Sequence, residues 1–316
     1  MAEIRSSAIA TIALVHGIAQ EQGSADGLEQ AWLPHLAGGV RVAGFAELAD
    51  RLWRDRATPG GIDARMAFYG DCFLRPGHMG ADPGDLTAGQ QALAEQLAHA
   101  WLERTAATSP DALDRREAQR ALRPNGERQG AGAMARTAIA GLARLRWFAP
   151  FGMAMAERFV VRALTQVTRY FTEERVRGHA LAEVLKLVGP ETRVLLGHSL
   201  GSVVAYEAAH HLERPLPLLV TLGSPLGLRM IVYERLRPQP PRFPPAVSRW
   251  VNLAGRDDCI AAAPDLTALF GPTLPAHASL EGGWTVDTGA KPHDPTYYLT
   301  KQETGRPIAQ ALLQEG

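Results

Sequence analysis

The stretch Val194–Ser202, VLLGHSLGS, places Ser199 between two glycines directly after an apolar run. The residues that follow, SVVAYEAAHHLE, have the composition of a helix, so the sequence predicts a strand, a tight turn and a helix. Such a turn imposes strained backbone angles on Ser199, and its flanking glycines permit close approach of neighbouring segments. The hydroxyl then stands at a helix amino terminus, where the dipole favours developing negative charge. We therefore interpret Ser199 as a nucleophile.

Short apolar runs alternate with longer helix-forming stretches along the rest of the chain, which is typical of a mainly parallel sheet flanked by helices. The predicted strands are Ala10–His16, Ala64–Tyr69, Arg193–Gly197, Leu218–Leu222, Trp250–Leu253 and Trp284–Val286. The predicted helices are Leu28–Leu36, Ala88–Ala106, Thr172–Val188, Gly201–Leu212 and Thr296–Leu313. The Pro-rich stretch 235–249 is expected to be a surface loop. The sequence thus predicts an α/β fold.

The composition of the chain argues against some classes of function. Lys+Arg and Asp+Glu both total 33 in 316 residues, so no global charge attracts nucleic acid. The two cysteines suit free thiols and a reducing compartment, from which we expect a cytoplasmic protein. No apolar run reaches the roughly 18 to 20 residues of a membrane span, and the apolar N-terminal stretch is interpreted as a buried strand.

About a hundred residues separate the strand ending near Gly70 from the helix near Thr172, far more than a crossover needs. We expect three parts: residues 1–71 and 172–316 form the core, and residues 72–171 form a helical lid or cap. The middle of the insertion, residues 109–133, is polar and is expected to be mobile. Residues 134–171 are apolar and helical in composition.

A serine nucleophile needs a base and a carboxylate that orients the base. A predicted strand runs into Asp257 and Asp258, and we favour Asp258 because it precedes Cys259-Ile260, although Asp257 remains an alternative. In the chain order Ser, acid, His, only His277 and His293 remain as bases. We favour His293, since it lies in the loop between a predicted strand and the last predicted helix, at the edge of the sheet.

The oxyanion of the reaction also needs donors. One is the backbone N–H of Leu200, which follows the nucleophile. The other is that of Ile18, which lies just past His16-Gly17 at the end of the first strand.

With these elements in order, the chain resembles the α/β-hydrolase superfamily, in particular lipase-like and esterase-like members. The matching motifs are LVHGI at 14–18, YGD at 69–71, GHSLGS at 197–202, GRDDCIA at 255–261 and the histidine of KPHDPTYY at 291–298. The likeness covers the sheet and its C-terminal helices but not the insertion. It implies catalytic Ser199, Asp258 and His293, oxyanion donors Ile18 and Leu200, and no metal or organic cofactor. In the sheet order of this family Cys72 and Cys259 lie too far apart for a disulfide.

These motifs predict a serine hydrolase that cleaves carboxylic esters, with a hydrophobic or lipid-like small molecule as substrate. A thioesterase or a peptidase would use the same acyl-enzyme chemistry, and a non-catalytic module that binds a membrane or a partner is the alternative from another class. The oligomeric state is not predicted.

Residues 134–171 carry six arginines against one acidic residue, Glu157, a local excess of +5. One interpretation is a cap that packs its apolar face on the core and leaves its arginines in water. The other is an amphipathic lid that makes peripheral contact with an anionic lipid surface.

Overall fold

The computed structural model describes residues 9–74, 86–123, 131–146, 152–289 and 291–314. Its sheet has six strands in the order β2-β1-β3-β4-β5-β6, and every neighbouring pair is parallel. The strands are β1 (Ile12–Val15), β2 (Ala64–Ala67), β3 (Val194–His198), β4 (Leu216–Leu222), β5 (Val247–Gly255) and β6 (Ser279–Val286). The predicted α/β class and parallel sheet are therefore confirmed.

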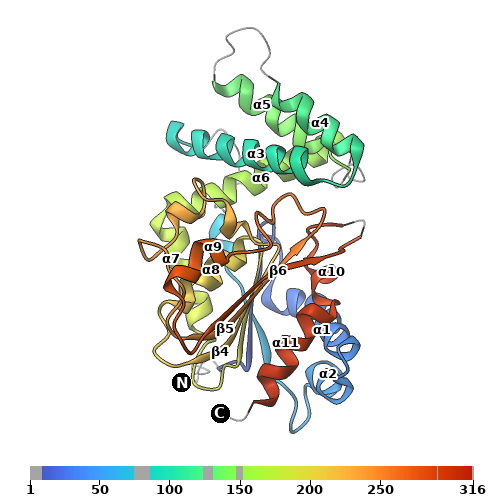
Figure 1. The fold of residues 1–316 in the computed structure, drawn as a ribbon, viewed down its shortest axis with the longest axis vertical. Helices are drawn as coiled ribbons and strands as arrows, with labels where there is room; N and C mark the ends of the chain where they lie inside the picture. The colour runs from blue at the N-terminus through green and yellow to red at the C-terminus, as the bar shows by residue number, and fades with distance from the viewer. Residues whose placement is uncertain (1–8, 75–85, 124–130, 147–151, 290, 315–316) are drawn as a thin grey trace.

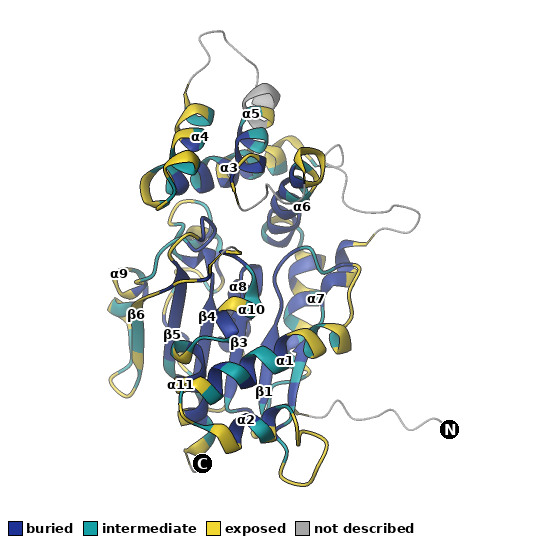
Figure 2. Ribbon diagram, turned by 90° about the vertical axis from the view of Figure 1, so that its right-hand side faces the viewer, coloured by how far each residue is buried: buried dark blue, intermediate teal, exposed yellow. Residues whose placement is uncertain are grey.

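Both faces of the sheet are covered by helices, which explains why every residue of β1 and β3 is buried. Ile12 and Leu14 of β1 pack with helices on one face, whereas Ala13 and Val15 pack with helices on the other. On the first face lie α1 (Ala25–Val42), α2 (Ala46–Leu52), α10 (Pro295–Leu299) and α11 (Gln302–Leu313). On the second face lie α7 (Glu174–Leu185) and α8 (Leu200–Ala209). Figure 2 shows the buried sheet between these layers.

The segment between β2 and β3 adds α3 (Ala88–Thr108), α4 (Ala112–Leu122), α5 (Ala131–Ala143) and α6 (Met153–Thr172) before α7. These four helices lie beyond one end of the sheet (Figure 1). That end is the carboxyl end of the strands, because Arg104 of α3 donates to the carbonyl of Ala262, which follows β5. The helical composition predicted for 134–171 is confirmed in the described residues.

The elements differ from the expectations in four places. Residues 112–122 form a helix, α4, because Asp111 accepts the N–H groups of Leu113 and Asp114 as its N-cap. The Pro-rich loop ends earlier than expected, since β5 starts at Val247 and pairs with β4 from there. The last predicted helix is divided into α10 and α11, and α2 was not predicted at all. Residues 124–130 lie outside the described residues.

Cys72 and Cys259 are buried free thiols, as expected. Within the described ranges, no helix is both long and apolar enough to cross a bilayer.

Candidate active site at the carboxyl edge of the sheet

The strand order places a topological switch point beside β1. The chain passes from β1 to β2 on one side, then crosses back to β3 on the other side and continues outward. In open α/β sheets the loops that leave such neighbouring strands diverge at the carboxyl edge, where a ligand can enter. The loops in question follow Val15 of β1 and His198 of β3. Ser199 and the dipeptide His16-Gly17 are therefore neighbours at this edge.

Ser199 has an unusual backbone conformation. It lies between β3 and α8 with φ 55° and ψ −128°, a combination that L residues rarely adopt. Its N–H donates to the carbonyl of Leu222 at the end of β4 (2.9 Å), which ties the turn to the neighbouring strand. The side chain is 2% exposed. The strained turn predicted around Ser199 is thus present.

Three glycines make this turn possible because neighbouring atoms occupy the space that a side chain would need. A Cβ at Gly197 would lie 2.4 Å from the carbonyl oxygen of Gly201. A Cβ at Gly201 would lie 2.3 Å from the carbonyl oxygens of both Val15 and His16. A Cβ at Gly17 would lie 2.7 Å from the Cβ of Ser199. The loop after β1 therefore touches the serine directly.

Asp258 and His293 form a buried pair. His293 Nδ1 lies 2.7 Å from Asp258 Oδ2, and both side chains are almost fully buried. The other carboxylate oxygen accepts the N–H groups of Ile260 (2.9 Å) and Ala261 (3.3 Å). Asp257, in contrast, is exposed, and burial together with the charge of Asp287 raises its pKa. Of the two candidate carboxylates, Asp258 is the one that contacts His293.

Tyr298 is a further member of this cluster that the sequence analysis did not identify. Its hydroxyl donates to Asp258 Oδ2 (2.6 Å) and accepts the N–H of Gly255 (2.5 Å). Burial and the nearby Asp258 raise the pKa of Tyr298 well above its usual value, so the hydroxyl stays protonated and can donate. In the sequence, Tyr298 belongs to the motif KPHDPTYY. In the structure, α10 places it near Asp258.

His293 lies next to the backbone that flanks Ser199. Its ring centroid is 4.6 Å from that of His198, the residue before the serine. A Cβ at Gly223 would lie 3.2 Å from His293 Nδ1 and 2.9 Å from Asp258 Oδ2. Gly223 directly follows Leu222, whose carbonyl accepts the Ser199 N–H. The serine and the Asp258–His293 pair therefore meet at the end of β4. The alternative base, His277, is exposed.

Burial also lowers the pKa of the two histidines near Ser199, His198 and His16. Desolvation, followed by the proximity of His293, lowers the pKa of His198 well below its usual value. Desolvation lowers the pKa of His16 to about 4, so this imidazole is neutral at pH 7. His16 Nε2 accepts the N–H of Tyr69 (3.1 Å), and the proton is therefore on Nδ1, which donates to the carbonyl of Gly17 (2.7 Å).

That hydrogen bond orients the amide of Ile18. In a trans peptide the carbonyl of one residue and the N–H of the next point in opposite directions. Because His16 binds the carbonyl of Gly17, the N–H of Ile18 points away from the imidazole. Leu200 supplies the first N–H of α8, at the helix end where amides have no partner within the helix. Both predicted donors therefore belong to backbone that adjoins Ser199.

The insertion reaches this site with polar side chains. Gln166 of α6 accepts the N–H of Ala19, the residue after Ile18 (2.8 Å). Arg104 of α3 donates to the carbonyl of Ala262 (2.7 Å), four residues past Asp258. Sequence patterns did not identify Gln166, because its burial to 1% exposure becomes visible only in the structure.

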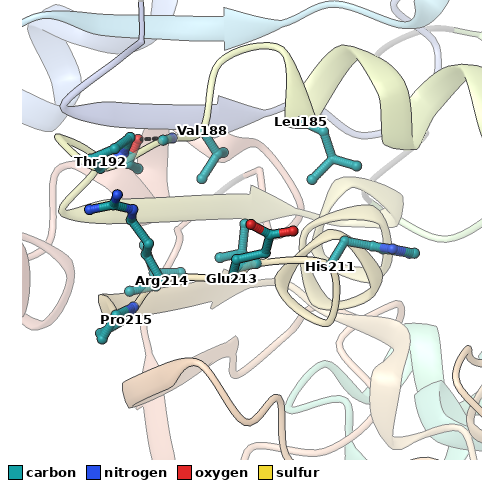
Figure 3. A pocket seen from close by; sticks show the side chains of 11 residues that line it. Leu185, Val188, Thr192, His211, Glu213, Arg214 and Pro215 are labelled. Carbon is teal, nitrogen blue, oxygen red and sulfur yellow. Dashed lines mark hydrogen bonds between the residues drawn. The ribbon is translucent and has the colours of Figure 1, made fainter.

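A separate pocket lies at the opposite edge of the sheet (Figure 3). It encloses about 360 Å³ between the segments that enter β3 and β4, with Thr192, His211 and Arg214 in its wall. Because Ser199 follows the carboxyl end of β3, this pocket belongs to the amino edge and is remote from the serine. Among the described residues, no three His, Cys, Asp or Glu side chains gather as a metal site.

Comparison of the chain with models of protein families, with curated proteins and with solved structures gives no match.

Proposed function

We propose that this chain is a serine hydrolase with an α/β-hydrolase fold that cleaves carboxylic esters through an acyl-enzyme. One observation carries the proposal: a serine with a strained backbone binds Leu222, and a buried Asp258–His293 pair lies against the next residue, Gly223. A strained turn is retained where the surrounding structure stabilises it, and such turns cluster at reactive sites. A plain strand-to-helix connection requires neither the strain nor the buried pair.

In the proposed mechanism His293 acts as the base. Its Nδ1–H donates to Asp258, which leaves Nε2 as the proton acceptor of the neutral imidazole. The Ser199 oxygen forms a bond to the ester carbonyl carbon while its proton passes to His293. The amides of Ile18 and Leu200 donate to the resulting oxyanion. The bond to the alcohol then breaks as His293 protonates the departing oxygen, and water releases the acyl group by the same steps.

A hydrophobic substrate is favoured by the surroundings of the site. Ile18 and Leu200 belong to the same apolar cluster as side chains of α3 and α6, including Leu97, Trp101 and Val160. An acyl chain that extends from Ser199 toward the insertion would thus contact apolar groups. Thioesters and peptides would react by the same chemistry and remain alternative substrates.

Peripheral membrane contact by residues 134–171 remains a separate proposal. Four of the six arginines in this segment lie within ion-pair distance of an acidic side chain. The pairs are Arg144–Glu117, Arg146–Asp111, Arg162–Glu21 and Arg169–Glu173. The excess of +5 within the segment is therefore largely offset by residues outside it. We accordingly favour a cap that packs on the core.

The test is covalent labelling. Wild-type protein and the Ser199→Ala variant are treated with a fluorophosphonate probe, and the adduct is located by mass spectrometry. p-Nitrophenyl esters of short and long acyl chains are assayed in parallel, with His293→Ala and His277→Ala as a matched pair. We expect labelling at Ser199 only, ester hydrolysis by the wild type and by His277→Ala, and loss of hydrolysis in the other two variants. A wild type that neither reacts with the probe nor hydrolyses any acyl substrate would overturn the proposal.

A further inference from the structure

The loop after β1 also contains a strained residue. Ala19 has φ 61°, in the left-handed region that side chains other than those of glycine and asparagine disfavour. Ala19 directly follows Ile18, whose amide is the proposed oxyanion donor. A strained conformation persists only where contacts from outside the loop stabilise it.

The outside contact comes from the insertion. The side-chain oxygen of Gln166 accepts the N–H of Ala19 (2.8 Å), across 147 positions of the chain. This N–H and the carbonyl of Ile18 belong to one rigid peptide unit. His16 binds the carbonyl of the preceding unit, which joins Gly17 to Ile18. Both peptide units that flank the Cα of Ile18 are therefore fixed, one by the core and one by the insertion.

The orientation of Gln166 is itself defined. Its Nε2 donates to Glu21 Oε2 (2.8 Å), which identifies the opposite atom as the oxygen that faces Ala19. The second oxygen of Glu21 lies 3.1 Å from Arg162 Nε. Arg162 and Gln166 are four residues apart on α6 and so share one helix face. Glu21 and Gln166 are 3% and 1% exposed, which makes this network costly to break.

We propose that Gln166 is a positioning residue. It fixes the loop after β1, which carries the Ile18 amide, so that the insertion contributes to catalysis and is not only a cover. This inference rests on the proposed function, because it assigns Ile18 a role in the reaction. It goes beyond that function because Gln166, a residue of α6, would affect kcat although it lies outside the sequence motifs of the site.

The test compares two variants of the same helix. Gln166→Leu removes the acceptor with little change in size. Thr168→Val is the matched control, because Thr168 is fully buried on α6 and its hydroxyl has no hydrogen-bond partner within the described residues. For Gln166→Leu we expect kcat to fall by about 10- to 100-fold while KM changes by less than about 3-fold, since a misplaced oxyanion donor acts in the transition state. Thr168→Val should retain wild-type kcat.

A rescue experiment separates positioning from a loss of packing. Gln166→Glu alone places two carboxylates against each other and should also lower kcat. The double variant Glu21→Gln, Gln166→Glu exchanges the amide and the carboxylate, so that an acceptor again faces Ala19 and a donor faces residue 166. We expect the double variant to recover kcat at least about 5-fold relative to Gln166→Glu, in line with the coupling of groups in direct contact.

Hydrogen exchange gives a readout that does not need catalysis. The amide of Ala19 should exchange at least about 10-fold faster in Gln166→Leu than in the wild type or Thr168→Val. Unchanged exchange and unchanged kcat in Gln166→Leu would overturn this inference alone, leaving Ser199 labelling intact. A wild type that neither reacts with the probe nor turns over would instead overturn the proposed function, and with it the catalytic part of this inference.

Discussion

His293 Nδ1 lies 2.7 Å from Asp258 Oδ2, although the two residues are 35 positions apart in the chain. The contact forms because each residue belongs to a loop that follows a parallel strand, β5 for Asp258 and β6 for His293. Neighbouring parallel strands present their carboxyl ends at one edge, so short loops from both can meet there. The same edge carries Ser199, which directly follows β3.

Asp258→Asn should lower kcat for ester hydrolysis by about 10³- to 10⁴-fold, because an amide cannot stabilise the imidazolium and favours the wrong tautomer of His293. Asp257→Asn is the matched control, since Asp257 is exposed. Its activity should stay within about 2-fold of the wild type. Steady-state kinetics of both purified variants check this prediction, and equal losses in the two would contradict the assignment of Asp258.

Tyr298→Phe should destabilise the fold by about 1 to 3 kcal/mol, because it removes the hydrogen-bond acceptor of the buried Gly255 N–H. It also removes one donor to Asp258. Urea unfolding measures the change in the free energy of unfolding, and kinetics at a temperature where the variant is folded measure the change in kcat. Tyr297→Phe provides the control, as Tyr297 is the exposed neighbour on α10. Equal stability of the two variants would argue against the role assigned to the Tyr298 hydroxyl.

Gly201→Ala should destabilise the protein by about 2 kcal/mol or more, because the new methyl group would overlap the backbone oxygens of Val15 and His16. Gly178→Ala on α7 is the contrasting helical glycine, where a Cβ meets no atom within 4 Å. That substitution should stabilise by about 0.5 to 1 kcal/mol through helix propensity. Thermal unfolding of both variants provides the comparison. A Gly201→Ala variant as stable as the wild type would disprove the close approach of α8 to β1.

Stability should fall as the pH falls from about 6.5 to about 4, partly because of His16. Burial lowers the pKa of this imidazole from 6.5 to about 4, so within that window the unfolded chain binds a proton that the folded chain does not. The contribution of His16 to the free energy of unfolding is fully present above pH 6.5. About 3 kcal/mol of it is lost by pH 4. His210, with a pKa lowered by burial to about 4, acts in the same direction.

The variant His16→Asn isolates the share of His16, because asparagine can still donate to the Gly17 carbonyl but does not titrate. Urea unfolding at several pH values between 7 and 4 should give a shallower pH dependence for the variant than for the wild type. Parallel curves for the two proteins would show that His16 is not buried in its neutral form.

Much of the candidate site could be predicted from local patterns. The glycines around Ser199 and the apolar run before it define a strand, a turn and a helix within a dozen residues, and the structure has these elements. Predictions were less accurate where local composition and tertiary contacts disagree. Residues 112–122 are polar, yet they form α4, which packs against α3 and α5. Val247 follows a Pro-rich run, yet it starts β5 and pairs with Leu216 of β4.

The sequence by itself determined the elements of the carboxyl edge, because the apolar pattern of a strand, the glycines of a tight turn and the composition of a helix are all set by residues a few positions apart. It also supplied the chain order of serine, acid and histidine. Only the tertiary structure decided that Asp258 and not Asp257 contacts His293, that Tyr298 binds the same carboxylate, and that Gln166 reaches Ala19. Those contacts join residues 35 to 147 positions apart. Their geometry depends on how strands and helices pack, which no local pattern encodes.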